Sequence, residues 1–286
     1  MTLINILVLA IIQGAAELLP VSSSAHVIVC AKLMGLEPTQ PEMTLLLVML
    51  HTGTMFAVIC YFWNSWKESF FCSKKAFGES LKRIAIATVL TGVVGITLKI
   101  LIERFMFSNT PHAEIELLFG NLRLISIALA AVGVLIIFAG KKVGDEQRES
   151  SLGVRESCWI GIVQGFCLPF RGFSRSGATI SAGLLLGIAR TKVEEFSFAL
   201  AVVLTPPVIA REVLRLLKAQ SAQSLHENGI FGLLAPSLFG MVISFISGIL
   251  ALRWLSSWLE RGRWHLFGIY CLCASLIVYL LHRGGY

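Results

Sequence analysis

Six long apolar segments constrain the fold of this chain more than any other feature of its sequence. They cover residues 43–62, 84–102, 118–140, 196–217, 229–252 and 266–282. A helix needs about 20 mostly apolar residues to cross the hydrocarbon core of a bilayer, so each segment has the length of a membrane span or nearly so. Only 14% of the 286 residues are charged, whereas a soluble domain carries about 25%. We therefore expect one all-α integral membrane domain covering residues 1–286.

The positive charge of the chain carries information on orientation. The net charge is +7, and the Lys and Arg residues lie mainly in short loops between apolar segments. Loops of this kind orient a polytopic protein, because cytoplasmic loops carry an excess of Lys and Arg. The pattern argues against nucleic acid as a partner and makes the membrane, with its anionic lipid heads, the expected one.

Two further apolar regions, residues 3–34 and 156–190, do not fit the pattern of a single span. Each is interrupted by polar residues, at Gln13–His26 in the first region and at Gln164–Thr179 in the second. Non-helical backbone is tolerated at membrane depth only where it is buried in protein or lines a cavity. We therefore expect each region to form a re-entrant helical hairpin, which enters and leaves the membrane on one side.

The two interrupted regions resemble each other in sequence. Ala10–Gly14 pairs with Gly161–Gly165, and Ser23 pairs with Ser174 at the same offset of 151 residues. The chain thus reads as two repeats, about 1–140 and about 150–286, each with one hairpin and three spans. An odd number of crossings inverts the second copy in the membrane. We predict six transmembrane helices plus two re-entrant helical hairpins in two inverted-topology repeats.

The loop charges favour this topology over eight simple crossings. With re-entrant hairpins, one face collects Lys67, Lys74, Lys75, Lys82, Arg83, Lys141, Lys142, Arg148, Arg155, Arg190, Lys192, Arg253, Arg261 and Arg263. The other face keeps Lys32, Arg104, Lys218, Arg283 and the span-end residues Arg211 and Arg215. The cation-rich face is assigned to the cytoplasm, so both termini and the mouth of the first hairpin face outward. Eight crossings would divide the charges more evenly, and that alternative stays open.

The polar interruption of the first region combines residues that are costly inside a membrane. Gln13 and Glu17 are four residues apart and share one face of a helix, and Pro20 then ends regular helical bonding. Ser23 and His26 follow the proline. Ionisable residues inside membrane segments are expensive and indicate a functional site by default. The alternative is a helix end at which Glu17 and His26 reach the interface while the serines cap a helix.

The second interruption is rich in groups that bind anions. It runs from Arg171 to Thr179 and reads Arg-Gly-Phe-Ser-Arg-Ser-Gly-Ala-Thr. Glycines let backbone N–H groups approach a ligand, and hydroxyls before a helix start favour anions. Arg175 offers a planar fork of donors that matches phosphate oxygens. We predict a phosphate cradle here, and the alternative is a cytoplasmic turn with a solvated arginine pair.

Together the two interruptions suit phosphoryl transfer. This chemistry needs a cation holder, a nucleophile or base, and a stabiliser of developing charge. The first interruption offers a carboxylate, a hydroxyl and an imidazole, and the second a guanidinium, hydroxyls and amides. Glu17 and Gln13 are expected to hold Mg²⁺ or Ca²⁺ only in part, with water and substrate oxygens completing the shell.

Two long motifs carry a specific resemblance to a known family. Glu17-Leu-Leu-Pro-Val-Ser-Ser-Ser-Ala-His26 and Gly172-Phe-Ser-Arg-Ser-Gly-Ala-Thr179 resemble the signature motifs of the bacitracin-resistance family, the undecaprenyl-diphosphate phosphatases. The similarity extends over essentially the whole chain, including His51–Gly53 and Glu194–Phe198. The resemblance implies the six spans and two inverted hairpins expected above. It also implies a bacterial plasma (inner) membrane, with the active site opening to the outer, periplasmic face.

The resemblance further implies an activity and its residues. The family removes the terminal phosphate of undecaprenyl diphosphate with a divalent metal (Mg²⁺ or Ca²⁺), which recycles the carrier lipid for peptidoglycan synthesis and confers bacitracin resistance. Ser23 is the preferred nucleophile with His26 as its base, and the reverse assignment stays open. The resemblance assigns Glu17 and Gln13 to metal binding, and it also assigns Glu17 to positioning of the diphosphate. Arg175 clamps it, and substrate contacts are implied for Ser174, Ser176, Gly177, Thr179, Gln13 and Arg171.

Two positions depart from the family pattern. Arg171 stands where the family usually has a proline before Gly172, which adds a cation and loses a rigid turn. Gln13 replaces a glutamate found in many members, which leaves one carboxylate fewer. These departures bear on metal affinity more than on the reaction.

Some polar or helix-breaking positions are assigned structural roles. His51 is interpreted as a packed histidine near a helix kink. Pro206-Pro207 is expected to break the span that begins near residue 196, and Thr52-Gly53 to break its counterpart, making room for the hairpin tips. Residues 141–156 read as a solvated linker between the repeats.

Three functions compete at this point. A metal-dependent lipid-diphosphate hydrolase uses every motif residue, whereas a flippase or transporter of the same lipid needs Arg175 and a cavity but neither Ser23 nor His26. Inverted repeats are typical of alternating access, which keeps the transporter alternative open. The intact motifs argue against a catalytically inactive scaffold, and a homodimer is left open.

Overall fold

The structure is a computed structural model that describes residues 2–36, 41–106, 120–142, 152–222 and 229–285, and these residues fold into ten α-helices. Six of the helices are long and apolar enough to cross a membrane. They are α3 (Pro41–Ser69), α4 (Lys74–Met106), α5 (Leu122–Lys142), α8 (Arg190–Ala222), α9 (Gly229–Glu260) and α10 (Trp264–Arg283). The prediction of six membrane-spanning helices is therefore confirmed.

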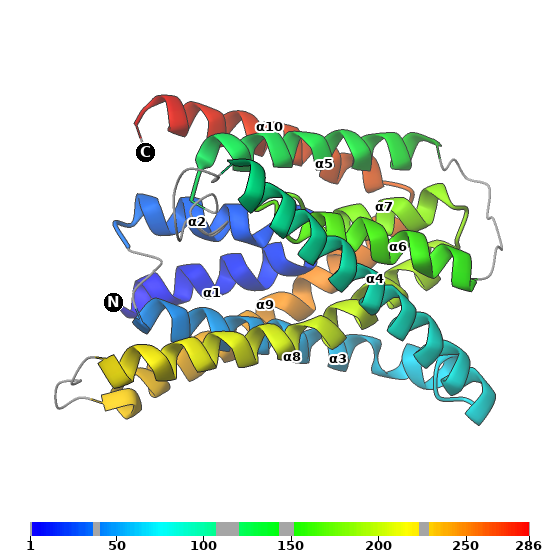
Figure 1. Ribbon diagram of the computed structural model, residues 1–286, viewed down its shortest axis with the longest axis horizontal. Helices are drawn as coiled ribbons and strands as arrows, with labels where there is room; N and C mark the ends of the chain where they lie inside the picture. Colours follow the sequence, from blue (N-terminus) through cyan, green and yellow to red (C-terminus); the bar gives the residue numbers. More distant parts are fainter. Residues whose placement is uncertain (1, 37–40, 107–119, 143–151, 223–228, 286) are drawn as a thin grey trace.

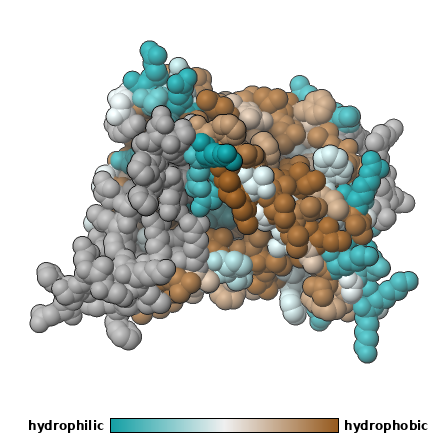
Figure 2. Space-filling view, in the orientation of Figure 1, coloured by the Kyte–Doolittle hydropathy of each residue, from teal (hydrophilic) through white to brown (hydrophobic). Residues whose placement is uncertain are grey.

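The outer surface of the long helices is apolar. Val89, Ile96 and Phe105 on α4 are more than half exposed, although an aqueous surface would disfavour such side chains. Figure 2 shows apolar side chains across the middle of one face and hydrophilic ones toward its right-hand side and its upper left. This distribution is that of a multi-pass membrane protein whose solvent is lipid.

The first interrupted region forms two short helices, α1 (Leu3–Leu18) and α2 (Ser23–Leu33). Only residues 19–22 separate them, so the predicted interruption at Gln13–His26 is too long: the helix continues through Gln13 and restarts at Ser23. The break falls at Pro20, which has no N–H to donate, and at Ser22, whose φ is +68°.

The second interrupted region forms α6 (Val154–Cys167) and α7 (Arg175–Leu185), separated by residues 168–174. Gln164 again lies inside a helix, so the predicted interruption from Gln164 to Thr179 is also too long. The turn needs a glycine at Gly172, because its φ is +98° and a Cβ there would lie 2.6 Å from the Ile125 carbonyl oxygen. Ser174 then caps α7 by accepting a hydrogen bond from the Gly177 N–H at 3.2 Å.

The short helices lie between two groups of long ones (Figure 1). In that view α5 and α10 run side by side along the top, while α3, α8 and α9 run along the bottom. The α1–α2 pair opens toward the end of the molecule where both termini lie, and the α6–α7 pair lies toward the opposite end. Among the helix pairs in close contact are α5 with α10, α3 with α8, α1 with α9, and α4 with α6.

The predicted breaks within two spans are wrong. Helix α3 runs without interruption through Thr52-Gly53, and helix α8 runs through Pro206-Pro207. Gly53 instead allows close packing of two long helices, because a Cβ there would collide with the Met241 carbonyl oxygen of α9. Of the predicted linker at 141–156, the ends belong to α5 and α6, and residues 143–151 lie outside the described residues.

Candidate active site

The carboxylate of Glu17 is the centre of a polar cluster at the end of α1. Its Oε2 atom accepts a hydrogen bond from Ser23 Oγ at 2.5 Å and another from Gln13 Nε2 at 3.0 Å. Gln13 and Glu17 are one helical turn apart, and Ser23 is the first residue of α2. The short break between α1 and α2 therefore places a hydroxyl against a carboxylate.

His51 of α3 belongs to this cluster, although the sequence favoured a packed histidine at a kink. Gln13 Nε2 lies 3.0 Å from His51 Nδ1 and donates its second proton there, which makes Nδ1 the acceptor. The same Nδ1 lies 3.7 Å from Glu17 Oε2. The signal that indicates such a residue is an ionisable side chain within a span.

Arg175 brings the second helix pair to the same carboxylate. Its Nη2 atom lies 3.7 Å from Glu17 Oε1, and both side chains are four-fifths buried. Its Nη1 atom is buried and has no hydrogen-bond partner among the described residues. Buried donors are normally satisfied, so this guanidinium retains a donor for an anion that would lie beside Glu17.

His26 faces α10. Its Nδ1 lies 2.8 Å from the Ser22 carbonyl oxygen and its Nε2 lies 2.7 Å from the Tyr270 hydroxyl. Both ring nitrogens are therefore engaged, and Ser23 donates to Glu17, whereas the sequence favoured His26 as the base for Ser23. Burial lowers the pKa of His26, opposed by the bond to Ser22, so the imidazole is neutral at pH 7. Tyr270 gives no sequence signal, because it is 244 residues from His26.

The charge state of Glu17, on a helix outside the six spans, follows from its neighbours. Burial raises the pKa of this carboxyl, but the charge of Arg175 and the hydrogen bonds from Ser23 and Gln13 lower it, and the lowering prevails. The net pKa lies below the ordinary range of a glutamate. The side chain is thus an anion at neutral pH and can accept a proton only transiently.

The hydroxyls of the predicted phosphate cradle bond mainly to protein. Ser176 Oγ donates to the Leu19 carbonyl at 3.3 Å and ties the start of α7 to the first break. Thr179 Oγ1 is fully buried, donates to the Arg175 carbonyl at 2.8 Å and lies 2.6 Å from Ser197 Oγ of α8. Ser174 is the buried cap of α7. These contacts position Arg175, and substrate contact by the three hydroxyls stays a prediction.

The two breaks are also linked through the side chain of Ser24. The Gly172 N–H points to Ser24 Oγ at 3.5 Å, and Ser24 Oγ lies 3.2 Å from Ser22 Oγ. Arg171, just before this glycine, is exposed. Substrate contact by Arg171 also stays a prediction.

The donor set around Glu17 fits a divalent cation only as part of a shell. The described residues contain no group of three or more His, Cys, Asp or Glu side chains that could hold a metal ion. Glu17 supplies carboxylate oxygens, and Gln13 has its amide carbonyl oxygen left, since its nitrogen serves Glu17 and His51. Hard cations accept such oxygens together with oxygens from substrate or water.

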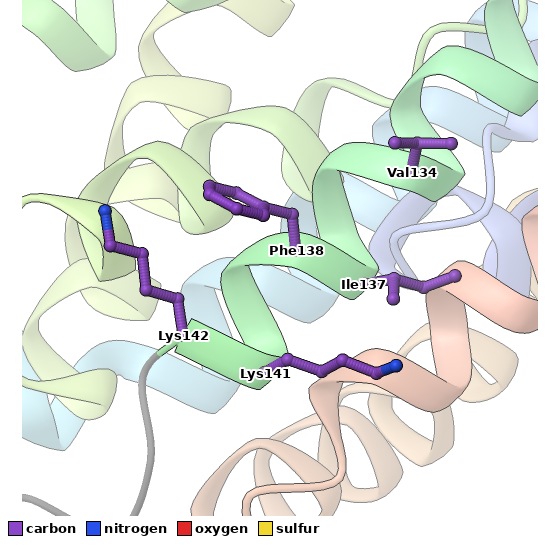
Figure 3. A pocket seen from close by; sticks show the side chains of 5 residues that line it. All are labelled: Val134, Ile137, Phe138, Lys141 and Lys142. Carbon is purple, nitrogen blue, oxygen red and sulfur yellow. The ribbon is translucent and has the colours of Figure 1, made fainter.

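A separate cavity of about 420 Å³ lies at the end of α5 (Figure 3). It is lined by Val134, Ile137, Phe138, Lys141 and Lys142. None of these residues belongs to the Glu17 cluster. In Figure 3 the ammonium groups of Lys141 and Lys142 point away from each other, so they do not converge on one anion.

The fold and the cluster define a class of protein. The chain is a multi-pass helical membrane protein in which two broken helix pairs bring a carboxylate, a hydroxyl and a guanidinium together. The family of the bacitracin resistance protein BacA matches residues 6–277. This chain belongs to that family.

Similar proteins cover the chain almost completely. Undecaprenyl-diphosphatase 2 of Acinetobacter baylyi is 56% identical over 282 residues, which is 98% of each chain. Undecaprenyl-diphosphatase of Rhodopirellula baltica is 30% identical, again over 98% of each chain. Undecaprenyl-diphosphatase 2 of Burkholderia orbicola is 33% identical over 99% of each. The resemblance inferred from the two motifs is confirmed.

Proposed function

We propose that this chain hydrolyses undecaprenyl diphosphate to undecaprenyl phosphate and inorganic phosphate. The reaction returns the carrier lipid to peptidoglycan synthesis and confers resistance to bacitracin. The relatives carry the name of this activity. The observation that carries the proposal is the convergence of Ser23, Glu17 and the unpaired donor of Arg175.

Ser23 is the nucleophile of the first step. Its Oγ attacks the terminal phosphorus, and the bond from that phosphorus to the bridging oxygen breaks, so undecaprenyl phosphate leaves. The hydroxyl proton passes to Glu17, whose Oε2 lies 2.5 Å away. Arg175 stabilises the charge that develops on the phosphoryl oxygens, which is the usual task of a guanidinium in phosphoryl transfer.

Water completes the reaction in a second step. Its oxygen attacks the phosphorus on Ser23, its proton goes to His26 Nε2, and the bond from phosphorus to Oγ breaks. Ser23 recovers its proton from Glu17, inorganic phosphate leaves, and His26 releases its extra proton to solvent. His26 is suited to this task because it is neutral and its Nδ1 proton is fixed by the Ser22 carbonyl.

Glu17 and Gln13 would hold the divalent metal, Mg²⁺ or Ca²⁺, together with oxygens of the substrate. When bound, such an ion neutralises charge on the diphosphate oxygens. Gln13 contributes an amide oxygen where many family members have a carboxylate, so the protein part of this site carries a single negative charge.

The two helix pairs are proposed to be re-entrant hairpins of inverted repeats. If α1–α5 correspond to α6–α10, a two-fold axis would exchange equivalent helix contacts. The packing of α1 on α9 then matches that of α6 on α4, and the α5–α10 contact is its own equivalent. At the α5–α10 contact, a Cβ at Gly133 would meet the Gly268 carbonyl at 2.9 Å, and one at Gly268 would meet the Gly133 carbonyl at 2.6 Å.

The site is proposed to open to the outer face of the bacterial plasma membrane. The loop cations give the support, since they gather on the face opposite the two termini. A carboxy-terminal alkaline phosphatase fusion should be active and a fluorescent protein fusion dark, and the reverse pattern would overturn this orientation. A homodimer stays a prediction.

A lipid transporter without hydrolysis finds no support. The relatives are named as diphosphatases, and a transporter would leave the short bond between Ser23 and Glu17 without a use.

The test is phosphate release from undecaprenyl diphosphate by the purified protein in detergent. Release should stop with chelator and fall strongly in Ser23→Ala, His26→Ala and Arg175→Ala. Glu79→Gln, an exposed position paired with Arg83, is the matched control and should keep full activity. Unchanged release in all three site variants would overturn the catalytic assignment.

A further inference from the structure

Tyr270 contacts His26 in two ways. The two rings stack with centroids 5.7 Å apart and planes inclined by 14°, and the phenol oxygen lies 2.7 Å from His26 Nε2. Tyr270 belongs to α10, the last helix, whereas His26 belongs to α2. A stack alone could be packing, but the second contact ends on the nitrogen that the proposed second step uses.

The protonation of the His26 ring follows from its other partner. The Ser22 carbonyl oxygen can only accept, so Nδ1 at 2.8 Å carries a proton. In the neutral ring Nε2 is then an acceptor, and the Tyr270 hydroxyl donates to it. When Nε2 takes a proton, the same hydroxyl can accept from it, because a phenol both donates and accepts.

We propose that Tyr270 is a positioning residue for His26, which holds the imidazole ring in one orientation before and after proton uptake. The inference rests on the proposed function for the role of His26. Tyr270 does not touch the reacting phosphoryl group in this assignment. It acts only by fixing where the basic nitrogen lies, while the Ser22 carbonyl fixes which nitrogen is basic.

The surroundings of the pair support a rigid holder. Cys271, next to Tyr270, is fully buried and donates from its Sγ to the Pro20 carbonyl at 3.3 Å. Two adjacent residues of α10 therefore contact the break and the helix that follows it. Ser22, whose carbonyl fixes Nδ1, has a positive φ. Such a conformation is strained in a residue other than glycine and persists only where surrounding contacts hold it.

The first test is Tyr270→Phe, which removes the hydroxyl and keeps the stacked ring. Tyr270 is half exposed, so the variant leaves no cavity in the core. We expect kcat for phosphate release to fall about tenfold, which corresponds to a hydrogen bond worth about 1.4 kcal/mol. KM should change less than about twofold, because the hydroxyl acts on the chemical step and not on substrate binding. Tyr279→Phe, also half exposed on α10, is the control and should match the wild type.

The second test reads the hydrogen bond at His26 Nε2 directly by nitrogen NMR of labelled histidine in lipid nanodiscs. The His26 signals, assigned by their loss in His26→Gln, should show Nδ1–H in both proteins, with the Nε2 resonance of Tyr270→Phe displaced from that of the wild type because the hydroxyl is lost. An unchanged Nε2 resonance, or unchanged kcat in Tyr270→Phe, overturns the inference. Full activity of His26→Gln would instead overturn the proposed role of His26, whatever the Nε2 resonance shows.

Discussion

Gln13 and Gln164 stand at matching positions of two similar helices, but their side chains meet different groups. Gln13 donates to Glu17 and His51 in the candidate active site. Gln164 is fully buried, donates to Thr91 of α4 at 3.1 Å, and leaves its carbonyl oxygen without a partner among the described residues. One glutamine is part of a reactive cluster, and the other joins two helices.

The backbones beside the two glutamines pack in the same way. A Cβ at Gly14 would lie 2.6 Å from the Ser244 carbonyl of α9, and one at Gly165 would lie 2.8 Å from the Thr91 carbonyl of α4. At the shared offset of 151, however, Glu17 corresponds to Leu168 in the sequence. The comparison teaches that the two broken helix pairs pack in a similar way but contribute different chemical groups to the site.

The strongest test of this division is Glu17→Gln. The variant keeps the shape of the side chain but removes the charge and the proton acceptor of Ser23, so kcat for phosphate release should fall about 10²–10⁴-fold. Glu156→Gln on the second pair, which loses only the cap of α6 at Gly153, should keep activity within about twofold. If kcat of Glu17→Gln stayed within about tenfold of the wild-type value, Glu17 would not be the proton acceptor of Ser23.

Arg175 is the contribution of the second pair, and Arg175→Gln should lower kcat/KM about 10²–10³-fold through loss of charge stabilisation. Arg175→Lys should recover only part of this, because a lysine restores the charge without the planar fork. Steady-state phosphate release measures both. Arg83→Gln, at an exposed ion pair with Glu79, serves as the control, and full recovery by lysine would show that the fork is not needed.

The glutamines themselves give opposite expectations when changed to glutamate. Gln13→Glu adds a carboxylate beside Glu17 and His51, and the Mg²⁺ concentration for half-maximal activity should fall about tenfold. Gln164→Glu places a buried charge beside Thr91 and should destabilise the fold by roughly 3–5 kcal/mol. A magnesium titration and a thermal unfolding experiment measure the two effects. Similar behaviour of both variants would mean that the glutamines are equivalent after all.

The smallest effects should appear where the two pairs are alike. Gly14→Ala and Gly165→Ala each force a methyl group against a carbonyl, and each should destabilise the protein by about 1–3 kcal/mol. Gly92→Ala on α4 meets no atom within 4 Å and should be neutral or slightly stabilising. Thermal unfolding in detergent measures all three, and a large difference between the first two would break the proposed equivalence of packing.

Much of the fold could be predicted from the sequence, because lipid imposes a length and a composition on every span. The six spans and both broken regions were predicted near their observed places. The exact breaks were not, since the helix tolerates Gln13 and Glu17 and yields only around Pro20 and Ser22. The breaks expected at Pro206-Pro207 and Thr52-Gly53 fail because a polar turn at membrane depth would cost more than keeping the helix.

The site divides in the same way. The sequence alone identified Glu17, Ser23, His26 and Arg175 as candidate site residues. Charged side chains and hydroxyls beside a proline are too costly in an apolar segment to be there by accident. Which of them touch was decided by the tertiary structure. Ser23 bonds Glu17, and His26 bonds Tyr270, through contacts between segments up to 244 residues apart. The sequence does not decide these pairings, because the first depends on the geometry of the break between α1 and α2 and the second on where α10 packs.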